Sequence, residues 1–229
     1  EELAAVEAVL QSGPFEFEGI FTHFATADEA DTTQLIKQIE KFRRLVDELS
    51  VKPAHVHYSN SAYALWHGAG DSAIVRYGIG IYGINPSNGD LALKDEAALT
   101  PALRWETEMV KVKKLEAGDT VSYGATYTAD EPQWVATLPV GYADGFIRAY
   151  NKGEVLVDGV RCPIVGRICM DQCMIRLPHE FPVGTTVTLL GKDGDEEITA
   201  IELAKRSETI AYEVLCIISD RVKRVYINE

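Results

Sequence analysis

The first part of the chain alternates between helical and strand-like patterns of hydrophobic residues. Shorter runs rich in β-branched and aromatic side chains predict strands at 19–24, 54–58 and 73–77. Between the first two runs the apolar residues follow helical spacing, which predicts an amphipathic helix. These residues are Leu35, Ile36, Ile39, Phe42, Leu45, Val46 and Leu49. Such an alternation indicates parallel strands joined by right-handed crossovers.

The number of strands in this part is too small for a closed barrel. The pattern predicts only about three strands, whereas a packed parallel barrel needs roughly eight. Either the sheet is open, or part of a barrel lies outside these 229 residues. The chain begins within a helical pattern and without a capping residue, so we expect a truncated barrel.

From about residue 99 the hydrophobic pattern changes to strict alternation. Leu103, Trp105, Thr107 and Met109 share one face of a strand, separated by charged residues. Further strands are expected at 154–157, 186–190 and 222–227, and a helix at 200–205, with turn signals at 116–119, 158–159 and 192–195. We therefore expect a division into a unit at 1–98 and a mostly antiparallel β domain at 99–229.

Composition and charge exclude several classes of partner. The chain is 46% hydrophobic and 25% charged, with a net charge of −13, so nucleic acid and anionic membranes are not expected to bind it. No apolar run is long enough to span a bilayer, and residues 1–4 do not resemble a signal peptide. A cytoplasmic location is expected.

The cysteines and histidines do not form a metal-binding motif. The four cysteines contain no Cys-x-x-Cys pair, and the five histidines contain no His-Glu-x-x-His pattern. We expect no bound metal, and we expect the thiols to be reduced and buried.

Polar residues follow each of the three predicted strands. His23 follows the first, Asn60 and Ser61 follow the second, and Arg76 with Gly78 follows the third. In parallel barrels this edge carries the active site, and Ser61 with nearby amides is suited to a phosphate dianion. Each position also has a structural interpretation: a buried core histidine, a helix cap and a turn, respectively.

The β domain contains three stretches that are dense in glycine and polar residues, at 121–124, 138–145 and 165–171. A glycine-rich strand end is commonly only a bulge. Three such stretches in one domain indicate more than a purely structural sandwich.

At these positions the sequence resembles the alanine racemase family, with the motifs in the family's order. The matching segments are 19–28, 57–62, 75–83, 122–124, 141–145, 166–171 and 211–214. The resemblance implies an α/β plus β fold: the second half of a pyridoxal-phosphate-binding (β/α)8 barrel of the TIM type, followed by a mostly antiparallel C-terminal β domain.

The resemblance also implies an activity: an isomerase that depends on pyridoxal 5′-phosphate (PLP), interconverts L-alanine and D-alanine with a lysine and a tyrosine as its two bases, and supplies D-alanine for peptidoglycan. Tyr123 matches the tyrosine. Because an unperturbed phenol has a pKa of about 10, it needs help to act as a base near neutral pH, and the match assigns that help to His23 and Arg76. Arg76 would also face the pyridine nitrogen and leave it unprotonated.

Other matching positions fall into three sets. The implied phosphate ligands are Asn60, Ser61, Gly78, Ile79 and Tyr212. The implied substrate site contains the Met170 amide, flanked by Cys169 and Asp171. The implied entrance consists of an inner gate of Tyr142 and Tyr212 and an outer layer of Asp28, Arg148, Arg167 and Ile210. Family members form homodimers, so Tyr123 is expected to act at the partner's cofactor.

The chain departs from the family's pattern in one respect. None of its eleven lysines lies in a matching motif, and the substrate-binding arginine of the barrel's first half has no counterpart. We therefore expect the chain to need its N-terminal half for activity. Three alternatives stay open: a racemase for serine or another small amino acid, a non-catalytic PLP-binding or regulatory module, and a structural assembly domain. Tyr123 and Met170 argue against the module, since a carrier needs neither a second base nor a carboxylate site.

Overall fold

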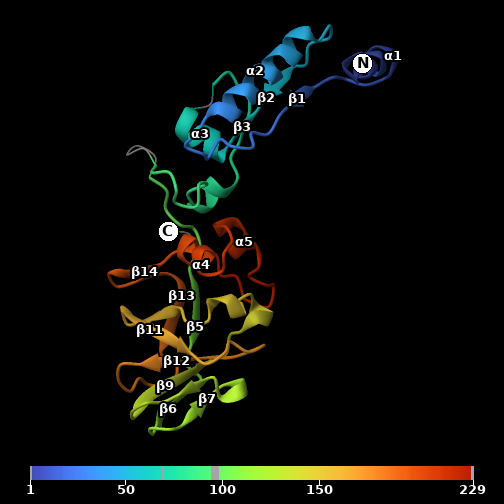
Figure 1. Cartoon of the computed structure of the whole chain (residues 1–229). Coiled ribbons are helices and arrows are strands. Elements are labelled where there is room, and N and C mark those ends of the chain that lie inside the picture. Colours follow the sequence, from blue (N-terminus) through green and yellow to red (C-terminus); the bar gives the residue numbers. More distant parts are fainter. Residues whose placement is uncertain (1, 69, 94–97, 228–229) are drawn as a thin grey trace. The chain divides into compact units, whose positions relative to one another are not determined.

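The computed structural model describes residues 2–68, 70–93 and 98–227. The chain divides into two compact units, Glu1–Thr100 and Pro101–Glu229. Figure 1 follows them along the sequence, from the helices and short strands of the first unit to the large sheet of the second.

In its described residues, the first unit contains short parallel strands and three α-helices. Its strands are β1 (Gly19–Phe21), β2 (His55–His57), β3 (Ser59–Asn60) and β4 (Val75–Arg76). Its helices are α1 (Glu2–Ser12), α2 (Thr33–Glu48), α3 (Ser61–His67) and the 3-10 helix η1 (Ile79–Tyr82). β1 pairs with β2 and β3 pairs with β4, both in parallel, which confirms the predicted strand direction.

Helix α2 packs its apolar stripe against the strands (Figure 1). Leu35 and Phe42 of α2 join Phe24, Tyr58 and Tyr63 in one buried cluster. Burial of these side chains removes apolar surface from water and holds the helix on the sheet. Ile36 departs from the prediction, because it lies at the margin of the stripe and is exposed.

The second unit is built on an eight-stranded sheet with the order β14-β13-β10-β11-β12-β9-β6, and β5 also pairs with β13. All of these pairings are antiparallel. The strands are β5 (Trp105–Glu108), β6 (Lys111–Leu115), β9 (Gln133–Leu138), β10 (Glu154–Val157), β11 (Val160–Val165), β12 (Cys173–Leu177), β13 (Thr186–Asp193) and β14 (Glu196–Ile198).

Shorter elements surround this sheet. A separate hairpin joins β7 (Thr120–Val121) to β8 (Tyr127–Thr128). The helices are α4 (Ala200–Arg206), α5 (Ala211–Cys216) and the 3-10 helices η2 (Tyr123–Ala125), η3 (Tyr142–Asp144) and η4 (Arg148–Tyr150).

The alternating pattern predicted much of this unit. Trp105 and Met109 are buried, as the strand pattern requires, and the intervening Glu106 and Glu108 are exposed. The predicted strand at 154–157 coincides with β10, and the predicted helix at 200–205 coincides with most of α4.

Two expectations for the second unit are wrong. Residues 222–227 form no strand; within this segment Arg224 donates to the carbonyls of Ile218, Ser219 and Val222. The cysteines are not all buried: Cys162 and Cys173 lie in the core, Cys169 is half-buried, and Cys216 is exposed at the end of α5. Among the described residues, no helix has both the length and the apolar character needed to cross a bilayer.

Candidate active site

Three polar residues meet at the carboxyl ends of the parallel strands in the first unit. Arg76 Nη2 lies 3.3 Å from Nδ1 of His23, and Asn60 Nδ2 lies 3.4 Å from Nε2 of the same ring. Parallel pairing brings them together, because it places the ends of all these strands at the same edge. His23 is exposed, so it is not a buried core histidine.

Arg76 is held from several sides. Its Nη1 lies 2.6 Å from Nδ1 of His57, its Nη2 donates to the carbonyl of Thr22 at 2.8 Å, and the guanidinium lies 5.1 Å from the centre of the Phe21 ring. Burial lowers the pKa of Arg76, but a guanidinium in this environment keeps its positive charge. Since arginine only donates hydrogen bonds, His57 Nδ1 must be an acceptor.

His57 was missed by the sequence interpretation, although it lies within a quoted motif. Burial, Arg76 and His55 lower its pKa, which favours the neutral ring that accepts from Arg76. The available signal was its position as the last residue of β2, the strand paired with β1, three residues before Asn60.

Two of the predicted phosphate ligands, Ser61 and Gly78, meet at the start of η1. Ser61 Oγ accepts from the backbone N–H of Gly78 at 2.8 Å and of Gly80 at 3.4 Å. Because both contacts use the oxygen as acceptor, the hydroxyl hydrogen is left to donate. Ile79 begins the 3-10 helix, so its N–H is not used by the bonds within that helix. Asn60 accepts from the N–H of Tyr63 at 2.9 Å, which confirms the helix-cap interpretation for its oxygen.

This donor set fits the cofactor that the sequence implies. It combines a guanidinium, an amide nitrogen, a hydroxyl and backbone N–H groups, and none of the predicted ligands is acidic. Such groups suit a phosphate dianion and a pyridine nitrogen that accepts a hydrogen bond.

In the second unit, Tyr123 begins η2 directly after the hairpin strand β7 and is 76% exposed. The preceding residue, Ser122, bonds to Arg167: its hydroxyl accepts from Arg167 N–H at 2.8 Å and donates to the Arg167 carbonyl at 3.1 Å. The structure thus brings the loop of Tyr123 against the loop of Arg167.

The loop that carries Tyr142 lies against the segment of Cys169 and Met170. Tyr142 N–H donates to Cys169 O and Ala143 N–H donates to Met170 O, both at 3.0 Å. A Cβ on Gly141 would lie 2.2 Å from Cys169 O, so this close approach requires glycine. Tyr142 of the predicted entrance therefore lies next to Cys169 and Met170 of the predicted substrate site, although they are far apart in the sequence.

Asp171 is engaged by an arginine that the sequence interpretation did not identify. Arg221 Nη2 donates to Asp171 Oδ1 at 2.7 Å, and Arg221 Nε lies 3.3 Å from Asp144 Oδ1. The other oxygen of Asp144 accepts from the N–H of Gly141 at 2.9 Å. Asp171 thus ties the substrate segment to the Tyr142 loop through Arg221.

The remaining predicted entrance residues lie on other elements. Arg148 is the first residue of η4, Ile210 precedes α5, and Tyr212 lies within α5. Asp28 is in the first unit, in the loop between β1 and α2. The structure thus brings some of the predicted residues of each unit together and places the remaining entrance residues on separate elements.

Comparison with known proteins covers nearly the whole chain. The model of the alanine racemase N-terminal domain matches residues 1–86, and that of the alanine racemase C-terminal domain matches residues 102–226. The chain belongs to the alanine racemase family. The fold class inferred from the sequence is thereby confirmed: part of the family's barrel followed by its antiparallel β domain.

Individual alanine racemases agree with the family model. That of Latilactobacillus sakei subsp. sakei (strain 23K) is 53% identical over 213 residues, covering 93% of this chain and 56% of that protein. The crystal structure of alanine racemase from E. faecalis is 50% identical with a TM-score of 0.92, covering 97% of this chain and 59% of that one.

A racemase with another name shares the fold. The structure of histidine racemase from Leuconostoc mesenteroides subsp. sake NBRC 102480 is 34% identical with a TM-score of 0.90, covering 99% of this chain and 61% of that one. The chain spans 56% to 61% of the length of the curated alanine racemases it matches.

Proposed function

We propose that this chain is part of a PLP-dependent alanine racemase, an isomerase that interconverts L-alanine and D-alanine. The observation that carries the proposal is the pairing of Arg76 with His23 at the carboxyl ends of the strands, beside the Ser61–Gly78 contact. The names of the relatives support the same activity.

The residues that would hold PLP are those of the donor set in the first unit, together with Tyr212 of the second unit. When bound, PLP withdraws electrons and so makes the Cα proton of an attached amino acid acidic. Ser61, Asn60, Tyr212 and the amides of Gly78 and Ile79 would hold the phosphate, with the Gly78 N–H shared between Ser61 Oγ and the phosphate. Arg76, held between His57 and Thr22, would donate to the pyridine nitrogen without protonating it.

Tyr123 would remove or return the Cα proton on one face of the substrate. Its exposed phenol hydroxyl is accessible, and its loop is fixed through Ser122. We propose that a lysine acts on the other face and that it lies outside these 229 residues, in the family's N-terminal half, because none of the eleven lysines here lies in a matching motif.

The Met170 amide would bind the substrate carboxylate, beside Cys169. Asp171 would act indirectly, since its carboxylate bonds to Arg221. Tyr142 and Tyr212, with Asp28, Arg148, Arg167 and Ile210 farther out, would limit entry to small amino acids. We propose a homodimer in the cytoplasm that supplies D-alanine for peptidoglycan.

Histidine is the one alternative substrate that the comparisons suggest. A histidine racemase shares the fold at 34% identity, so the fold alone does not fix the side chain that the pocket accepts. Alanine is favoured because the relatives at 48% to 53% identity are named alanine racemases.

The proposal is tested with Tyr123→Phe in the PLP-loaded holoenzyme, by following exchange of the Cα proton in D2O. Loss of a general base costs about 10²- to 10⁴-fold, so we expect such a loss for exchange from L-alanine and a much smaller one from D-alanine. Tyr127→Phe is the matched control, because the Tyr127 hydroxyl bonds to Gln133 in the same hairpin region. Equal losses for both enantiomers would reject Tyr123 as a base that acts on one face. In the unsubstituted holoenzyme, faster exchange with histidine or serine than with alanine would reject alanine as the substrate.

A further inference from the structure

The residue before Tyr123 has an unusual backbone conformation. Ser122 has φ 73° and ψ 169°, a region that is occupied almost only by glycine. A serine held there is strained, and the conformation persists only where the surroundings enforce it. The strain lies one residue from the phenol that would move the proton.

Two contacts enforce this conformation. The Ser122 hydroxyl accepts from Arg167 N–H at 2.8 Å and donates to Arg167 O at 3.1 Å. The strand-end residue beside it is Gly166, with φ 73°, where an added Cβ would lie 2.5 Å from the Cβ of Ser122. Glycine at 166 therefore allows the approach, and the paired hydrogen bonds hold it.

We propose that Ser122 is a positioning residue: it fixes the main chain of Tyr123 against the Arg167 loop and thereby aims the phenol. The inference rests on the proposed role of Tyr123 as a base. The same two hydrogen bonds also link the main chain beside the proposed base Tyr123 to the main chain of the entrance residue Arg167. A displacement of about 1 Å at a reacting group is enough to lower a rate about 100-fold. Loss of the Ser122–Arg167 hydrogen bonds is therefore expected to slow proton transfer by Tyr123.

Two substitutions distinguish the effect of the Ser122 hydroxyl from the effect of its strained backbone conformation. Ser122→Ala keeps the Cβ and the strain but loses both hydrogen bonds, whereas Ser122→Gly adopts the conformation freely and also loses the bonds. We expect both variants to lose about 10- to 100-fold in Cα-proton exchange from L-alanine, with a much smaller loss from D-alanine and little change in KM. Thr128→Ala, which removes an exposed hydroxyl from β8, serves as the control and should leave both exchange rates unchanged.

A second measurement does not depend on turnover. In the apoprotein, the Arg167 amide should exchange its hydrogen with solvent faster in Ser122→Ala and Ser122→Gly than in the wild type, because its acceptor is gone. Unchanged protection of that amide would overturn the structural part of the proposal. Full L-alanine exchange in Ser122→Gly, or equal losses for both enantiomers in Ser122→Ala, would overturn the positioning role.

Tyr123→Phe, measured in parallel, separates this inference from the proposed function. If Tyr123→Phe shows the enantiomer asymmetry and Ser122→Ala does not, Ser122 is not a positioning residue. If Tyr123→Phe shows no asymmetry, the proposed base is wrong, and the positioning role is rejected with it.

Discussion

At the scale of single residues, Gly141 permits the close contact between the Tyr142 loop and the segment of Cys169 and Met170. An added Cβ would lie 2.2 Å from Cys169 O and 2.4 Å from Met170 O. Both neighbours are backbone atoms of a segment that is itself hydrogen-bonded to residues 142 and 143, so neither moves without breaking those bonds.

We expect Gly141→Ala to lower the free energy of unfolding by about 1–3 kcal/mol, the usual cost of overpacking. Denaturant unfolding measures this loss. Gly118→Ala measures the cost of backbone strain without close packing, since a Cβ there meets no atom within 4 Å but alanine is strained at its φ of 92°, so we expect a smaller loss of stability there. An equal loss in the two variants would contradict close packing as the reason for glycine at 141.

Some of the site was predictable from sequence at this scale. His23, Asn60 and Arg76 each follow a strand, and parallel strands end at one edge, so their meeting follows from the order of elements alone. Arg221 was not predictable, because its partners Asp144 and Asp171 lie 77 and 50 residues away and only the folded loops bring them together.

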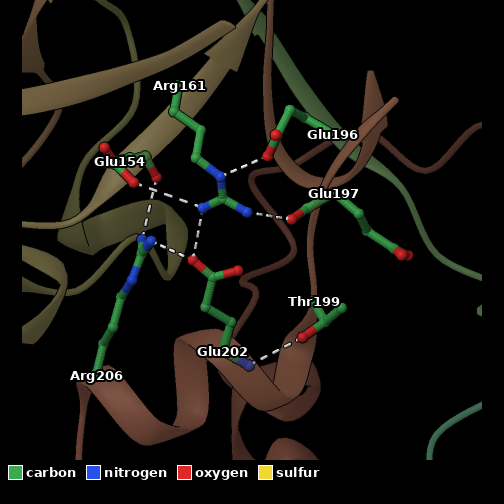
Figure 2. Close-up of polar contacts among 7 residues, drawn as sticks. All are labelled: Glu154, Arg161, Glu196, Glu197, Thr199, Glu202 and Arg206. Carbon is green, nitrogen blue, oxygen red and sulfur yellow. Dashed lines mark hydrogen bonds and ion pairs between the residues drawn. The ribbon is translucent and has the colours of Figure 1, made fainter. Parts of the chain in front are cut away.

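At the scale of elements, charged side chains tie α4 to the sheet (Figure 2). Arg161 of β11 binds Glu196 at 2.6 Å and Glu202 at 2.9 Å, and it donates to the carbonyl of Glu197. Glu202 of α4 also binds Arg206 one turn later. Glu202 and Glu196 raise the pKa of Arg161, as expected for a cation between two carboxylates.

We expect Glu202→Ala to destabilise the second unit by about 1–3 kcal/mol, because two partly buried guanidinium groups lose their shared partner. Thermal unfolding with and without added salt measures the effect, and salt should narrow the difference from wild type. Glu180→Ala is the control at an exposed loop position. The network is not stabilising if both variants unfold at the same temperature.

Helix α2 and the shorter α4 were predicted from the sequence, whereas α5 was not. Helix α2 has sixteen residues and a clear apolar stripe, whereas α5 has six, too few for a helical period to be recognised. Residues 222–227 have a strand-like composition. A strand also needs a neighbouring strand to pair with, which composition does not reveal. Tyr226 of this segment is 91% exposed.

At the scale of the whole molecule, the proposed racemase needs residues from two units. His23, Asn60 and Arg76 lie in the first unit and Tyr123 in the second. We propose that dimerisation brings Tyr123 of one subunit to the cofactor of the other, in an isologous arrangement.

This arrangement predicts complementation between two inactive variants. A Tyr123→Phe subunit and a subunit without the catalytic lysine, mixed in equal amounts, should form hybrid dimers with one intact site each. Random pairing makes half of the dimers hybrids, so about a quarter of the wild-type activity is expected. Each variant alone is the control. No recovered activity in verified hybrid dimers would exclude shared sites.

Strand β6 is the last strand in the order of the large sheet, which has a consequence for solubility. Its outer row of N–H and C=O groups is a template onto which a strand of another molecule could add. Three of its five residues are lysines, Lys111, Lys113 and Lys114, and all three are exposed. A second copy of β6 docking there would bring ammonium groups together and repel. The same strand that ends the sheet therefore disfavours addition of a second β6 at this edge.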